Sequence, residues 1–158
     1  MAPPQTTVST NRLRKIDHDF IEENIVKCDQ KIIVGGYSGA ITNARPLVES
    51  VLIYIDSEMT GREERFNGDL NALYKKVAKE LGLSVEKDAK IDEALKKLIS
   101  GMFSIVSGIT ELGNDLGDRH GRLRKTYRVD KHHATLIVNA AKSFSEFVFC
   151  SFESQHKE

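Results

Sequence analysis

The chain has no tryptophan, only two cysteines, and a single proline beyond residue 4. Cys28 and Cys150 are too few and too far apart for a metal cluster or a disulfide framework. Both lie in apolar helical patterns, so we expect free, buried thiols in a reducing cytoplasm. No apolar run approaches the roughly 20 residues that a membrane-spanning helix needs, and the first residues lack the apolar core of a signal peptide. We therefore expect a cytoplasmic protein with no membrane partner.

The chain also lacks net charge, because 23 Lys and Arg residues balance 23 Asp and Glu residues. This balance argues against a surface-wide basic field for nucleic acids or membranes, so any basic site must be local. A length of 158 residues with 40% hydrophobic residues is typical of one globular domain with a real core. We expect a flexible N-terminal tail over residues 1–15, rich in Pro, Thr and Ser, and a single helical domain over 16–152.

Apolar residues recur at three- and four-residue steps, and no useful length alternates with the period of two that strands show. This pattern predicts an all-α fold, a bundle of about five helices. Pro46 lies inside the second helix, where it should kink or restart the helix, and Ser38 is the expected N-cap. The expected helices cover about 16–34, 38–58, 69–81, 91–112 and 130–149.

The stretch GNDLGDRHGRLRKTYRVDKHHA, residues 113–134, departs from this pattern. It predicts a long basic loop of roughly 17 residues between the last two long helices, where bundles usually use two to eight. Clustered arginines favour phosphate groups, because a guanidinium can bind two oxygens at once. A solvated basic loop without function is the alternative. Between positions 118 and 131 two aspartates face six basic residues, a net charge of +4; these six are Arg119, Arg122, Arg124, Lys125, Arg128 and Lys131.

Histidines add chemistry to this loop. His120 lies between Gly117 and Gly121, which allow a tight turn and the close approach of a phosphate. A histidine can transfer a proton near neutral pH, although His120 could instead hydrogen-bond a carbonyl to stabilise the turn. His132 and His133 begin the last helix, where a capping role is the alternative to a binding role. No carboxylate or cysteine completes a recognisable metal spacing with these histidines, so we expect neither a metal nor a cofactor.

Four blocks of the sequence resemble the abortive-infection C-terminal domain family of bacterial anti-phage proteins. They occur in the family's order and spacing and cover about residues 16–150. The family is similar to a branch of the HEPN superfamily, whose members are helical bundles, often dimeric, and in many cases metal-independent ribonucleases. The resemblance implies a HEPN-like bundle, a homodimer, antiviral defence, and RNA or a nucleotide as ligand. The blocks are YSGAITNARPLVESVLIYI, DLNALYKKVAKELGLS, LISGMFSIVSGITELGNDLGDRHG and HHATLIVNAAKSFSEFVF.

The family's active motif is an arginine, usually followed by a polar residue such as asparagine, with a histidine a few residues later. Here Gly113 stands where that arginine would fall, while five other positions match: Asn114, Gly117, Asp118, His120 and Gly121. Through the resemblance, the expected catalytic residues are His120, Asn114 and Arg119, with Arg119 a candidate substitute for the missing arginine. The expected substrate-binding residues are Arg122, Arg124, Lys125, Arg128 and His133.

Because the motif arginine is replaced, two functions stay open. The first is a metal-independent endoribonuclease that uses the 2′-hydroxyl of RNA as the nucleophile. The second is a non-catalytic dimeric module that binds RNA, a nucleotide or a partner protein through the same basic loop. Gly113 favours the module, whereas Asn114 and His120 favour the enzyme.

Overall fold

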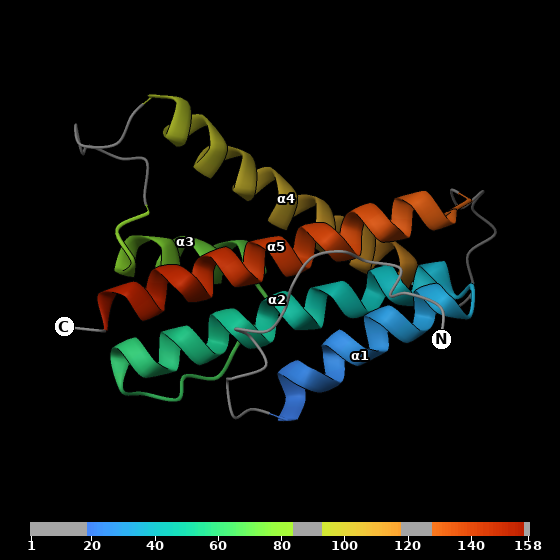
Figure 1. Ribbon diagram of the computed structural model, residues 1–158. Coiled ribbons are helices and arrows are strands. Elements are labelled where there is room, and N and C mark those ends of the chain that lie inside the picture. The colour runs from blue at the N-terminus through green and yellow to red at the C-terminus, as the bar shows by residue number, and fades with distance from the viewer. Residues whose placement is uncertain (1–18, 84–92, 118–127, 157–158) are drawn as a thin grey trace.

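The structure is a computed structural model that describes residues 19–83, 93–117 and 128–156. These residues form five helices, shown in Figure 1, and no strand occurs among them, which confirms the expected all-α bundle. The expected tail over residues 1–15 lies outside the described residues. The helices are α1 (Asp19–Ile33), α2 (Tyr37–Thr60), α3 (Leu70–Glu80), α4 (Glu93–Gly117) and α5 (Lys131–Gln155).

Helix α2 lies at the centre of the bundle and packs against each of the other four helices. It runs through Pro46 without the restart that the sequence suggested. An internal proline costs a helix about 3 kcal/mol, but each large apolar side chain that α2 buries contributes roughly 1.5–3 kcal/mol. Tertiary packing therefore outweighs the local penalty. The buried apolar residues of α2 are Ala40, Ile41, Ala44, Leu47, Val48, Val51, Leu52 and Ile55.

Local capping chemistry sets several helix ends. Asp69 caps α3 by accepting a hydrogen bond from the backbone N–H of Ala72 at 3.0 Å. Gly61 ends α2 with a φ of 67°, a left-handed conformation that glycine adopts without strain. The expected cap at Ser38 is wrong, because α2 begins at Tyr37 after Gly36, which offers no side-chain cap.

The main core joins all five helices around the buried ring of Tyr74. That ring meets Phe103 of α4 and Phe144 of α5 edge-on, with centroids 4.4 and 5.1 Å apart. A smaller buried cluster lies where α1 turns into α2 and α5 begins; it contains Cys28, Ile32, Ala40, Ile41, Ala134 and Val138. Leu112 and Val129 pack against this cluster. The smaller cluster thus positions the end of α4 and the residues that precede α5.

Helix α4 is less buried than its apolar periodicity predicts. Val106 and Ile109 are buried as expected, but Leu98 is 69% exposed, and Leu95 and Ile105 are also exposed. Figure 1 shows the N-terminal half of α4 extending away from the bundle. Among the described residues, no helix combines the length and apolarity needed to cross a membrane.

Candidate functional site

The predicted basic loop is shorter than the sequence indicated, because α4 continues to Gly117. Gly113 and Asn114 therefore belong to the last turns of α4, and the connection to α5 covers residues 118–130. Of the predicted site residues, the structure describes Asn114, Arg128 and His133. The other predicted site residues, Arg119, His120, Arg122, Arg124 and Lys125, lie outside the described residues.

A side chain from another helix reaches Asn114. The guanidinium of Arg45, on α2, donates a hydrogen bond from Nη1 to Oδ1 of Asn114. Its Nη2 donates to the backbone carbonyl of Gly68 at 2.9 Å, and its Nε donates to Oε1 of Glu49 at 2.7 Å. The Arg45 side chain is 18% exposed. One guanidinium thus links α2, the connection 61–69 and the end of α4.

Arg45 also lies against Gly113, the position that lacks the motif arginine. A Cβ atom placed on Gly113 would lie 3.5 Å from Cδ and 3.6 Å from Cβ of Arg45, which is ordinary van der Waals contact. The stem of Arg45 therefore crosses α4 at residue 113, and its guanidinium bonds the next residue. Sequence reasoning missed Arg45. The available signal was that Arg45 is the one basic residue of α2.

His133 performs the capping role that the sequence left open. Its Nδ1 accepts a hydrogen bond from the backbone N–H of Asp130 at 3.2 Å, and the two residues form a capping box at the start of α5. Nε of Arg128 lies 3.2 Å from Oδ1 of Asp130, and the Arg128 side chain is 90% exposed. Such an exposed pair is weak, so Arg128 can exchange Asp130 for another anion at little cost.

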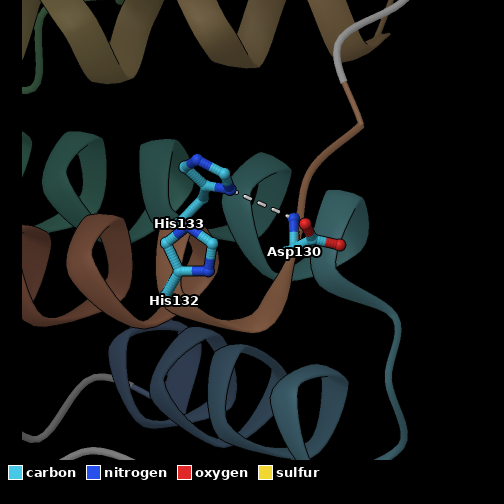
Figure 2. Close-up of side chains that lie close together, drawn as sticks. All are labelled: Asp130, His132 and His133. Carbon is cyan, nitrogen blue, oxygen red and sulfur yellow. Dashed lines mark hydrogen bonds between the residues drawn. The ribbon is translucent and has the colours of Figure 1, made fainter.

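Asp130, His132 and His133 gather near one another at the start of α5 (Figure 2). Their donor atoms lie within 4.8 Å of one another, and they are the one such group of three within the described ranges. However, Nδ1 of His133 already accepts a hydrogen bond, which places the proton of its neutral ring on Nε2. Neither nitrogen then offers a free lone pair to a metal. The positive end of the helix dipole further disfavours a cation here. The arrangement fits a helix cap, and a metal-free protein stays a prediction.

A cavity of about 580 Å³ lies between α2, the connection 61–69 and α3. Lys76 lines this cavity, and its Nζ lies 3.1 Å from a carboxylate oxygen of Asp56 and 3.1 Å from one of Glu64. Burial, and secondarily the neighbouring Asp56, raise the pKa of Glu80. These acidic groups are arranged around one ammonium group, which is the pattern of an ion-pair cluster that joins α2 to α3. The cavity lining contains no residue of the described parts of α4 or α5.

Comparison with known proteins identifies a family. A model of the Abi_C family, described as a HEPN-like domain, matches residues 19–152. No curated protein and no solved structure matches the chain.

Proposed function

Because the chain belongs to the Abi_C family of HEPN-like domains, we propose that it is a phage-defence protein that binds and cleaves RNA in the cytoplasm. The proposed site combines the end of α4 with the connection 118–130. This proposal rests on Asn114, which lies three residues before Gly117. Its side-chain amide is exposed, and the guanidinium of Arg45 holds it in place. A polar group held in place directly before the Gly117–Gly121 motif suits the positioning of a phosphate or of His120.

The proposed reaction needs no metal. The 2′-hydroxyl of RNA loses its proton to a general base, and its oxygen attacks the adjacent phosphorus. The bond from phosphorus to the 5′-oxygen breaks, and that oxygen takes a proton from a general acid. His120 fills one of these two roles, since histidine moves protons near neutral pH. The products are a 2′,3′-cyclic phosphate and a 5′-hydroxyl.

The basic residues of the connection bind the RNA backbone in this proposal. Arg119, Arg122, Arg124, Lys125 and Arg128 supply charge next to the reacting phosphate, where donors aimed at developing negative charge contribute most. Arg128 suits this role because its side chain is almost fully exposed. His133 is the weakest of the predicted substrate contacts, since its Nδ1 already accepts the cap hydrogen bond.

We also propose that the active form is a homodimer. The exposed apolar side chains of α4, Leu95, Leu98 and Ile105, recur at helical spacing and form one stripe. Helix α5 adds exposed Leu136 and Phe147. A second copy of the chain would cover these exposed apolar side chains. Sedimentation that shows a monomer at tens of micromolar would contradict the dimer.

A direct test is incubation of the purified protein with end-labelled total RNA in EDTA. The proposal expects cleavage that leaves 2′,3′-cyclic phosphate ends, and expects His120→Ala to abolish cleavage while RNA binding persists. Proton transfer by a positioned side chain typically contributes about 10²–10⁴-fold to a rate and little to ground-state affinity. Intact RNA with both proteins, together with no binding in low salt, would refute the proposal.

The replacement of the motif arginine by Gly113 favours a second candidate function. In this alternative the protein binds RNA, a nucleotide or a partner protein without cleaving anything. The same experiment separates the two functions. Salt-sensitive RNA binding without cleavage by the wild type would favour the binding module.

A further inference from the structure

We propose that Arg45 supplies the phosphate-contacting guanidinium of this site, from α2, at the place where Gly113 has no side chain. The inference rests on the proposed RNA-binding function and assigns a residue to it that the sequence motif does not contain. Its basis is the position of Arg45, which lies against Gly113 and bonds Asn114.

The hydrogen bonds of Arg45 leave capacity for a ligand. A guanidinium carries five N–H donors, and the three bonds to Glu49, Asn114 and Gly68 use one donor on each nitrogen. Within the part of the chain that the structure describes, one N–H on each Nη atom is left. Two N–H donors on one planar group match two oxygens of a phosphate. The partial exposure of the Arg45 side chain leaves room for such an approach.

The surroundings hold the guanidinium in place. Glu49, one helical turn further along α2, bonds Nε at 2.7 Å, and its own side chain is 23% exposed. The backbone carbonyl of Gly68, in the connection 61–69, accepts a hydrogen bond from Nη2 and restrains it. A donor held this way needs little reorganisation when charge develops on a phosphate, which is the condition under which electrostatic stabilisation is most effective. A flexible surface arginine would lack this advantage.

The competing interpretation is that Arg45 has a purely structural role, as a clasp that joins three segments of the chain through its hydrogen bonds. The two roles respond differently to rescue. A clasp is restored only by a side chain that makes the same three bonds. A phosphate contact is restored by any guanidinium that reaches the same place. Position 113 is suitable for such a rescue, since a side chain there would start in contact with the stem of residue 45.

The experiment compares wild type, Arg45→Gln, and Arg45→Gln combined with Gly113→Arg. Each protein is assayed for cleavage of labelled RNA and for salt-dependent binding of an uncleavable 2′-O-methyl oligonucleotide. Arg45→Gln should slow cleavage about 10²-fold, as loss of one transition-state donor does, and should flatten the salt slope by about 0.7, one phosphate contact. Adding Gly113→Arg should recover both. Arg65→Gln, which removes the same charge from an exposed position of the connection 61–69, should change neither.

Thermal melting accompanies each assay, so that loss of fold is recognised. If Arg45→Gln melts far below the wild type, Arg45→Met replaces it, because methionine keeps an apolar stem and also removes the charge, and the same rescue by Gly113→Arg is expected. The inference is overturned if a folded Arg45 variant keeps the wild-type slope, or if Gly113→Arg restores nothing. Failure of the proposed function looks different, because the wild type itself then neither binds nor cleaves RNA, and the inference falls with it. If the wild type binds RNA without cleaving it, the salt dependence of binding alone tests the role of Arg45.

Discussion

The ammonium group of Lys142 lies 2.6 Å from Oδ1 of Asp29, which joins α5 to α1 inside the bundle. The lysine side chain is 3% exposed and the aspartate side chain 24%. A charged group removed from water needs an opposite charge close by, because desolvation otherwise costs several kcal/mol. This ion pair is therefore an internal constraint on how α1 and α5 pack.

Removal of the Asp29 carboxylate should destabilise the protein strongly. We expect Asp29→Ala to lower the free energy of unfolding by about 3 kcal/mol, since it takes away an ion-pair partner of a buried ammonium group. Urea denaturation measures the change. Glu23→Ala is the matched control, because it breaks the exposed Glu23–Lys27 pair on the same helix. That control should cost less than about 1 kcal/mol, and equal losses in the two variants would contradict this interpretation.

The two cysteines should differ in reactivity. Burial raises the pKa of the Cys28 thiol to about 12, with opposing contributions from Lys142, which lowers it, and Asp29, which raises it. Neither cysteine forms a disulfide, as expected, but Cys150 is half-buried, which corrects the sequence-based prediction of two buried thiols. Because the thiolate is the reactive form, Cys150 should react first with iodoacetamide at pH 7.5. Mass spectrometry should show both cysteines labelled in urea well above the unfolding midpoint. Equal native rates would count against this ordering.

Stability should fall as pH rises through the titration of Glu80. Burial and Asp56 raise the pKa of Glu80 above its ordinary value of 4.5. Between the unfolded and folded pKa values, the folded protein then binds more protons than the unfolded one. The free energy of unfolding therefore decreases with increasing pH in that window. Glu80→Gln removes this loss, so it should stabilise the protein at pH 7. It should also make the melting temperature depend less on pH between pH 4.5 and 7. Glu58→Gln, at an exposed position of α2, should leave the pH profile unchanged.

Two substitutions at His133 separate capping from RNA contact. His133→Ala removes half of the capping box and should cost about 0.5–1 kcal/mol. His133→Gln should recover most of that stability, because glutamine is a common partner at this position of a capping box. Thermal melting provides the readout. Weaker RNA binding by a fully stable His133→Gln variant would indicate a substrate contact instead.

Helix periodicity predicted most of the fold because the bundle buries its helices along one stripe each. Its errors have local physical causes. Pro46 and Gly113 both suggest helix ends, but one residue that disfavours a helix costs only about 1–3 kcal/mol, less than long helices gain by packing. Periodicity also cannot tell which molecule covers a stripe. Leu98 and Ile105 fit the apolar spacing of α4, although both are exposed.

The candidate site was only partly predictable for a different reason. Asn114 belongs to a recognisable motif, whereas Arg45 is 69 residues away in the chain and reaches Asn114 only through the packing of α2 against α4. A pattern within one segment carries no information about such a contact. His133 shows the opposite case, since its capping partner lies three residues away.

The sequence separation of Arg45 and Asn114 has a consequence during synthesis. A nascent chain that ends before residue 114 can form α1, α2 and α3, yet it cannot place an amide on the Arg45 guanidinium. The contact exists only after α4 has left the ribosome and docked on α2. If the proposed cleavage of RNA depends on this contact, the nascent chain cannot carry it out until most of the protein has been translated.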